Sequence, residues 1–497
     1  MIPAFVGRRQ ELALLDRIWE SDKAALLVLY GRRRVGKTRL LTHWMKRHQD
    51  DGFYWMAEAT SALDQLRSFS QAIANFADPE TVAPLDFTYA NWEQALRQLA
   101  LYSRERRLAV FIDEVTYLMA VNPNFIATLQ KAWDHWLREA DVVLALSGSQ
   151  MSSMQKQLLS YQAPLYGRAT AQIMLPPLPF GVTRQYFPEF SAADRVAIYA
   201  IWGGVPAYWE RIDPALSVIE NLQAQLGYSN TWMLDEPRLL LQDFLTDLYN
   251  YVGIMRAMAQ GYETLSHISK RAGLSGGPAS KYLSILRETG FVERRVPVTE
   301  RSADSRRGRY FVTDPYLRFF YRFLAAYQSK LAMGQQEQML AAIERDLPAF
   351  IQKNTWQELC REWLLRASAH DELPLPVEEV GSEWKRSFSI DVVGISEEER
   401  SLTLGCCLWN SEPAGLEPLQ ELVRRTSSLI PGGEEDWSVY YVGFASGGWS
   451  ETAVAGAEAV VYEEKAARAR RKWRAAGVQL VDLPRLDADL ARWSDDL

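Results

Sequence analysis

Residues 24–38 read AALLVLYGRRRVGKT, and this stretch decides the fold. The apolar run Ala25 to Tyr30 predicts a buried strand that stops at Gly31, and a helical pattern runs from Arg39 to Trp44. Between strand and helix stands the pattern G-x-x-x-x-G-K-[ST], whose backbone N–H groups point at phosphate oxygens. The stretch therefore predicts a nucleoside triphosphate site on a parallel α/β sheet. The predicted nucleotide-contacting residues are Gly31, Arg32, Arg33, Arg34, Val35, Gly36, Lys37, Thr38 and Arg39.

Two of these residues have predicted chemical roles. Lys37 would bridge the β- and γ-phosphates and is a candidate catalytic residue, and the hydroxyl of Thr38 would be a ligand of Mg²⁺. A chance Gly/Lys turn is the alternative, and the flanking strand and helix argue against it. The pattern thus points to a bound triphosphate with its metal.

The composition of the chain limits the classes of protein to which it can belong. A chain of 497 residues with 48% hydrophobic content predicts several domains with buried cores. The net charge of −7 means that any nucleic-acid contact must come from a local patch. Three cysteines exclude a disulfide framework and zinc spacing, which favours a reducing, cytoplasmic setting. Polar residues close to Met1 predict no signal peptide, and no apolar run is long enough for a transmembrane helix.

A second strand ends in two carboxylates. Leu108 to Glu114 reads LAVFIDE, a buried strand whose carboxyl end would deliver charge to the nucleotide. Asp113 would hold the Mg²⁺ shell, and Glu114 would take a proton from the attacking water. An acidic strand end without function is the alternative, which the phosphate loop upstream disfavours. The strand predicted next ends in SGSQ, where Ser147 and Ser149 are both candidates to sense the γ-phosphate.

Arg168 in the sequence Tyr166-Gly167-Arg168 is a third candidate catalytic residue. It would stabilise charge on the transferred phosphoryl group, either in its own subunit or in a neighbouring one. An ordinary surface arginine is the alternative. Near the start of the chain, the backbone of Phe5 to Glu11 is a candidate to pack on an adenine ring.

Five motifs in a fixed order carry a family resemblance: FVGRRQEL, YGRRRVGKT, VFIDEV, LSGSQMSSM and PLYGRAT. Together they resemble the archaeal-type ATPase family within the STAND/AAA+ P-loop ATPases. The resemblance implies ATP as the nucleotide, and a parallel sheet with the phosphate-loop strand beside the VFIDE strand. It also implies a helical lid in which Gly204, Pro206 and Tyr208 face the adenosine. From the residues alone, Gly203 and Gly204 end one helix and Pro206 starts the next.

Residues 246–335 show the order helix, turn, helix, hairpin, which resembles a winged helix-turn-helix domain. Ser280, Lys281 and Ser284 would lie on the exposed face of the second helix. The hairpin carries six arginines against three acids, a net charge of +3; the arginines are Arg294, Arg295, Arg301, Arg306, Arg307 and Arg309. A contact with double-stranded DNA and a purely structural packing role both remain open.

The segment from Phe311 to Phe320 reads FVTDPYLRFF and resembles a segment of the family. There it precedes a domain of uncharacterised function with a restriction-endonuclease-like fold. Such nucleases combine a helix Glu, a strand Asp and an E-x-K strand around Mg²⁺. Glu358 and Asp391 match, but Cys406 and Leu408 stand where Glu and Lys are expected. We therefore expect a nuclease-like fold without nuclease activity.

The sequence thus predicts a multidomain α/β protein: a P-loop ATPase core (1–180), a helical lid (181–245), a winged helix-turn-helix (246–335) and a degenerate nuclease-like domain (336–497). It predicts an Mg²⁺-dependent ATPase that acts as a nucleotide-driven switch or motor, with DNA as a possible partner, no membrane contact and a possible oligomer. The alternatives are an ATP-gated DNA nuclease and a regulator that binds ATP without hydrolysing it. A basic helix from Lys465 to Arg474 is expected to be a solvated face.

Overall fold

Five parallel strands form the first sheet of the computed structural model, in the order β2-β3-β4-β1-β5. The model describes residues 5–227, 232–242, 245, 248–300, 302, 304–333, 335–430, 436–463 and 473–494. The strands are β1 (Ala25–Tyr30), β2 (Gly52–Met56), β3 (Leu108–Asp113), β4 (Val142–Gly148) and β5 (Ala171–Met174). The expectation that the phosphate-loop strand β1 lies beside β3 is wrong, because β4 pairs with both and separates them.

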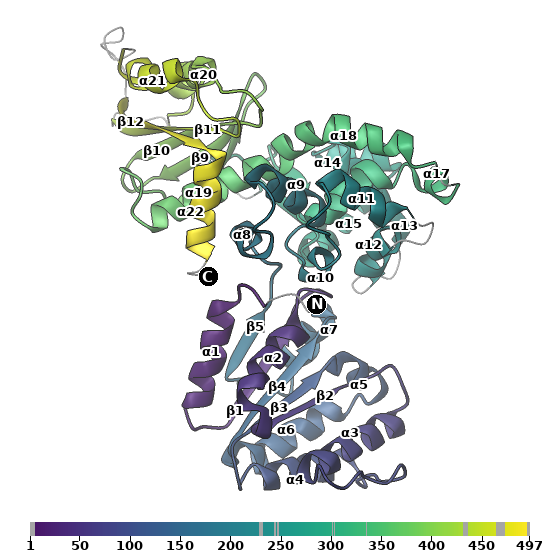
Figure 1. The fold of residues 1–497 in the computed structure, drawn as a ribbon. Coiled ribbons are helices and arrows are strands. Elements are labelled where there is room, and N and C mark those ends of the chain that lie inside the picture. The colour runs from purple at the N-terminus through teal and green to yellow at the C-terminus, as the bar shows by residue number, and fades with distance from the viewer. Residues whose placement is uncertain are drawn as a thin grey trace.

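Helices cover both faces of this sheet, so it forms the middle of three layers (Figure 1). Alternate residues of β1 explain why: Leu26 and Val28 belong to one buried cluster, whereas Leu27 and Leu29 belong to the cluster on the other face. The first cluster includes residues of α3 to α6, and the second those of α1 and α2. The helices are α1 (Arg9–Glu20), α2 (Lys37–Met45), α3 (Ala62–Ala77), α4 (Trp92–Tyr102), α5 (Val115–Val121), α6 (Phe125–His135) and α7 (Met151–Met154).

A helical region follows the sheet and ends in a two-stranded hairpin. The helices are α8 (Thr183–Tyr186), α9 (Ala192–Trp202), α10 (Pro206–Trp209), α11 (Val218–Leu226), α12 (Trp232–Gln242), α13 (Leu248–Ala259), α14 (Leu265–Ala272) and α15 (Gly276–Glu288). Antiparallel strands β6 (Val292–Arg295) and β7 (Arg309–Val312) come next. The helix, turn, helix and hairpin therefore occur where the sequence predicts them.

The chain then leads through a second helical segment into a mixed sheet. The helices are α16 (Pro315–Phe319), α17 (Gln328–Ala332), α18 (Glu337–Ile351), α19 (Gln357–Ala369), α20 (Glu417–Arg425), α21 (Glu451–Glu463) and α22 (Leu483–Ser494). The strands, in the order β12-β11-β10-β9-β8, are β8 (Glu379–Trp384), β9 (Ser389–Ser396), β10 (Ser401–Leu408), β11 (Trp437–Ala445) and β12 (Trp473–Asp482). Strands β10 to β12 are parallel, and β9 is antiparallel to both of its neighbours.

The later parts of the chain share one hydrophobic core. It runs from Leu178 through the helical region to one face of the second sheet and to α22. The C-terminal helix returns to the segment after β5: Arg195 of α9 and Asp487 of α22 form a buried ion pair with an N–O distance of 2.6 Å. Figure 1 shows the first sheet with its helices on one side of α8 and α10, and the remaining elements on the other. None of the described helices is long and apolar enough to cross a membrane.

Candidate nucleotide site

The phosphate loop, residues 31–38, joins β1 to α2 in a conformation that needs its glycines. Gly36 has φ of 96°, in the left-handed region that side chains disfavour. A Cβ on Gly31 would lie 2.5 Å from the carbonyl oxygen of Leu175. Lys37 Nζ donates to the carbonyl oxygens of Gly31 and Arg32, both at 3.1 Å, so its ammonium group lies over the loop. The helix N-terminus and the lysine thus converge where phosphates would bind.

Thr38, in the first turn of α2, lies beside Asp113 at the carboxyl end of β3. Thr38 Oγ1 donates to Asp113 Oδ2 at 2.6 Å, and Tyr54 OH of β2 donates to the same oxygen at 3.0 Å. Burial and the adjacent carboxylate raise the pKa of Tyr54, which keeps the phenol protonated as a donor. A hydroxyl beside a carboxylate suits Mg²⁺, which takes one or two protein ligands and completes its shell with phosphates and water. Among the described residues, no three His, Cys, Asp or Glu side chains come together as a metal-binding group.

Glu114 is held by the end of the neighbouring strand β4. Ser149 donates to Glu114 Oε2 through Oγ at 2.9 Å and through its backbone N–H at 3.2 Å. Glu114 itself has φ of 49°, a left-handed conformation that glutamate adopts only under constraint. Of the two serine candidates, Ser149 touches the predicted base, while Ser147 is buried and its hydroxyl has no partner among the described residues. Contact with a γ-phosphate remains a prediction for both.

Three arginines of the predicted nucleotide set reach away from the loop. Arg32 forms an ion pair with Asp314 and donates to Tyr208 OH at 2.9 Å. Arg34 pairs with Glu236, and Arg39 pairs with Glu210. All four partners come from the helical region or from the start of α16, between about 170 and 280 positions along the chain. The side chains of these arginines therefore fasten the loop to the rest of the protein, and nucleotide contact is left to their backbone.

Of the remaining members of the loop set, Arg33 is half-buried, and Val35 is fully buried in the core beneath α2. Arg8, which was not predicted as a site residue, contacts the backbone of the phosphate loop. Its guanidinium donates to Val35 O at 3.1 Å and to Pro176 O at 2.6 Å. Burial lowers the pKa of Arg8 from its ordinary value, although Glu11 opposes this effect.

A small cavity of about 20 Å³ marks the predicted adenosine side. Phe5, Val6, Arg39 and Pro206 line it, so the N-terminal segment, α2 and the helical region meet there. A base contact by Pro206 stays a prediction. Gly204 packs against Leu178: its carbonyl oxygen accepts from Leu178 N at 2.7 Å, and a Cβ there would lie 1.8 Å from Leu178 O.

Tyr208, the third lid candidate, is fully buried and turned toward the arginines of the loop. Its hydroxyl donates to Glu236 Oε1 at 2.6 Å and accepts from Arg32. Burial and the nearby Glu236 raise its pKa, although the positive charge of Arg32 opposes them. Gly204 and Tyr208 therefore have structural roles in this arrangement.

Arg168 lies at the opposite end of the sheet from the phosphate loop. Thr170, two residues later, pairs with Leu26 near the start of β1, whereas the loop follows the end of that strand. Arg168 donates to both oxygens of Asp134 at 2.8 Å, and this hydrogen bonding raises the arginine pKa and lowers that of Asp134. The geometry gives no role to Arg168 in its own subunit, and a role in a neighbouring subunit stays a prediction.

Of the two carboxylates predicted to remain from a nuclease site, Glu358 is hydrogen-bonded to arginines. Glu358 accepts from Arg318 at both oxygens, at 2.8 and 2.7 Å, and from Arg295 at 2.9 Å. Burial alone would raise the pKa of Glu358, but the two guanidinium groups outweigh it and lower the value. Burial raises the pKa of Asp391, and raises that of Cys406 on β10 to about 12. A carboxylate engaged by two arginines and a neutral thiol are poor ligands for Mg²⁺.

Three arginines of the hairpin form ion pairs within the chain. Arg307 pairs with Glu300 and with the fully buried Glu383, and its carbonyl oxygen accepts from Trp384 Nε1 at 2.9 Å. Arg309 pairs with Glu263, and Arg295 with Glu293 and Glu358. Of the two roles left open for the hairpin, these contacts favour packing, because the charges of Arg295, Arg307 and Arg309 are paired within the chain.

A few of the predicted basic residues remain outside that pairing. Arg306 is exposed, and Arg301 lies outside the described residues. The expected basic helix at Lys465 also falls there, except that Arg474 belongs to strand β12. On α15, Ser280, Lys281 and Ser284 are exposed as predicted.

Comparison with known proteins agrees with the phosphate loop and its acidic strand end. A family described as an ATPase domain predominantly from Archaea matches residues 5–212, and one described as archaeal and bacterial proteins of unknown function matches residues 320–418. The uncharacterized protein MJECL04 of Methanocaldococcus jannaschii is 26% identical over 438 residues, which cover 88% of this chain and 94% of the relative. The uncharacterized ATP-binding protein MJ0423 of the same organism is 51% identical over 45 residues, 9% of this chain and 76% of the relative.

Among solved structures, the Walker-type ATPase paby2304 of Pyrococcus abyssi is similar at 18% identity, over 64% of this chain and 96% of that chain, with a TM-score of 0.49. The family assignment depends on the sequence matches together with the loop geometry. Residues 5–212 of this chain are thus similar to the ATPase domain family found predominantly in Archaea.

Proposed function

We propose that this protein binds ATP with Mg²⁺ at residues 31–38, hydrolyses it, and uses the cycle as a switch. The observation that carries the proposal is the meeting of Thr38, Asp113 and Glu114, with Thr38 Oγ1 2.6 Å from Asp113 Oδ2 and Glu114 fixed by Ser149. Bound Mg²⁺ would neutralise phosphate charge. Thr38 and Asp113 would hold it, Lys37 would stabilise the phosphates, and Glu114 would accept the proton of the attacking water.

Replacement of Glu114 by Gln tests hydrolysis directly. Glutamine keeps an amide oxygen that can accept from Ser149, but it cannot take a proton from water. We expect ATP binding to be retained and phosphate release to fall by about 10²–10⁴-fold. Equal rates for wild type and Glu114→Gln would favour a protein that binds ATP without turning it over.

A chain of ion pairs supports the switch. Asp314 pairs with Arg32 of the loop and also caps α16, where its Oδ1 accepts from Leu317 N at 2.9 Å. One turn later in α16, Arg318 forms an ion pair with Glu358 of α19. The short helix thus joins the phosphate loop to the C-terminal sheet domain. A change at Arg32 on nucleotide binding would act on α16 and, through it, on that domain.

DNA is the proposed partner of the switch, through α14 and α15 instead of the hairpin. Lys270, Arg271, Lys281 and Arg287 are exposed on these two helices, and Glu288 is the exposed acid at their end. An exposed helix with a local positive excess matches the electrostatic footprint of duplex binding. In this proposal the hairpin serves as a packing module, with the boundaries at residues 180, 245 and 335 separating the functional parts.

A further inference from the structure

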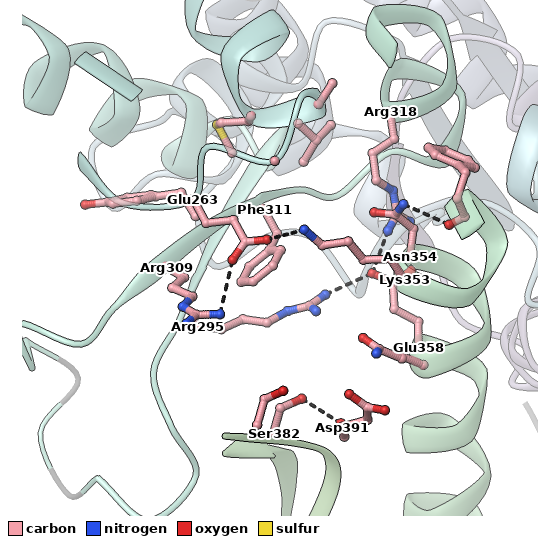
Figure 2. A pocket seen from close by; sticks show the side chains of 18 of the residues that line it. Glu263, Arg295, Arg309, Phe311, Arg318, Lys353, Asn354, Glu358, Ser382 and Asp391 are labelled. Atoms are coloured by element: carbon pink, nitrogen blue, oxygen red, sulfur yellow. Dashed lines mark hydrogen bonds and ion pairs between the residues drawn. The ribbon is translucent and has the colours of Figure 1, made fainter. Parts of the chain in front are cut away.

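A cavity of about 560 Å³ lies far along the chain from the phosphate loop. Its walls come from the hairpin β6–β7, from the segment between α16 and α19, and from strands β8 and β9. Figure 2 shows Arg295, Arg318, Glu358 and Asp391 around this space, with Lys353 and Glu263 at its side. The volume is in the range of sites for small organic ligands.

The lining is rich in paired charge with a cationic excess. Six cationic side chains face five carboxylates, and one of these, Glu383, is fully buried and already paired with Arg307 from outside the lining. The cations are Arg295, Arg309, Arg318, Arg322, Lys353 and Arg361. Guanidinium groups in such numbers suit the planar oxygen pairs of phosphates.

Arg361 hydrogen-bonds to neutral oxygens of the cavity wall. It donates to Ser382 Oγ at 3.0 Å and to the carbonyl oxygen of Asp391 at 3.1 Å, and no ion pair joins it to any described carboxylate. Burial lowers the pKa of Arg361, and the positive charge of Arg295 lowers it further. Glu358 opposes these effects on the pKa of Arg361 but is itself shared between Arg318 and Arg295, and the charge of Arg361 in turn opposes the rise in the pKa of Asp391. Two like charges at one buried wall favour an incoming anion.

Aromatic faces accompany these cations. Tyr310, Phe311 and Trp384 all line the cavity. The guanidinium carbon of Arg309 lies 4.9 Å from the ring centre of Trp384, and that of Arg295 lies 4.7 Å from the ring centre of Phe311. Stacked arginine and aromatic planes are the surfaces on which nucleobases pack.

We propose that this cavity binds a nucleotide, with its phosphate at Arg361 and Lys353 and its base against the aromatic wall. The ligand is either a free mononucleotide or the phosphorylated end of a nucleic-acid strand, since both present the same chemistry. This site is separate from the phosphate loop.

The test uses the full-length chain carrying Lys37→Ala, so that binding at the phosphate loop does not contribute. The probes are AMP, a 5′-phosphorylated oligonucleotide and the same oligonucleotide with a 5′-hydroxyl, measured by calorimetry. Arg361→Gln and the more exposed Lys353→Gln are compared with Arg424→Gln on α20, which lies outside the cavity. Circular dichroism confirms that each variant is folded.

We expect AMP or the phosphorylated strand to bind, and both cavity variants to weaken that binding about tenfold or more, while Arg424→Gln leaves it unchanged. Preference for AMP identifies a free nucleotide, and preference for the 5′-phosphate over the 5′-hydroxyl identifies a strand end. The proposal is overturned if no probe binds, if the 5′-hydroxyl strand binds as tightly as the phosphorylated one while AMP does not bind, or if Lys353→Gln and Arg361→Gln, both folded, bind as tightly as the Arg424→Gln control.

Discussion

The ion pair between Arg32 and Asp314 is the contact through which we expect the phosphate loop to be coupled to the C-terminal domain. Its side chains are only 13% and 10% exposed, so removing one charge leaves the other buried. Breaking a buried ion pair lowers the free energy of unfolding by about 3–5 kcal/mol. For Asp314→Asn we expect the lower end of this range, because Arg32 keeps its hydrogen bond to the hydroxyl of Tyr208. Asparagine still caps α16, whereas Asp314→Ala also loses the cap, for about 1 kcal/mol more.

A double-mutant cycle with Arg32→Met separates this coupling from other effects. The free energy of the first unfolding transition in urea is measured for both single variants and the double variant. We expect a coupling energy of at least about 1 kcal/mol. The exposed pair Lys131–Glu93 is the matched control, and about 0–1 kcal/mol is expected there. A coupling below about 0.5 kcal/mol for Arg32 and Asp314 would refute the relay.

Three further changes test the site and the partner. Lys37→Ala should abolish ATP binding in calorimetry, and retained affinity would refute the phosphate loop as the site. Ser149→Ala removes one of two hydrogen bonds to Glu114, so phosphate release should fall by about tenfold, less than in Glu114→Gln; an unchanged rate would remove Ser149 from the mechanism. Lys281→Glu with Arg287→Glu should weaken duplex DNA binding and reduce its salt dependence by about two ions, whereas Arg306→Glu on the hairpin should have little effect. The reverse ranking would restore the hairpin as the DNA contact.

Local patterns explain what could be predicted from the sequence. The strand, loop and helix around Gly36, and the apolar run that ends at Asp113, are each encoded within about ten residues, so their types and ends follow from periodicity and turn chemistry. The same holds for the helix-turn-helix and its hairpin. The contact between Asp113 and Thr38 could also be predicted from the sequence. Asp113 ends one parallel strand, Thr38 follows the loop after another, and the carboxyl ends of parallel strands meet at one edge of the sheet.

Non-local pairing explains the rest. The sequence around β1 does not indicate that β4 pairs with it. Nor does the sequence around an arginine of the phosphate loop indicate which side chain that arginine contacts. Arg32, Arg34 and Arg39 were expected at the nucleotide, yet their partners are remote in the chain. For the same reason the sequence left the role of the hairpin arginines open between DNA contact and packing, since their partners Glu358 and Glu383 lie later in the chain. Tyr54 offered a usable signal, as a polar residue near the carboxyl end of the strand beside Asp113.

The central claim is that residues 31–38 bind a triphosphate, while Asp113 holds the Mg²⁺ shell and Glu114 accepts the proton of the attacking water. A crystal structure with Mg²⁺ and a non-hydrolysable ATP analogue tests it most directly. The account predicts β- and γ-phosphates against the backbone of the loop, Lys37 turned from Gly31 O to the phosphates, and Mg²⁺ on Thr38 Oγ1 beside Asp113. A loop that stays empty while the analogue binds elsewhere would contradict it.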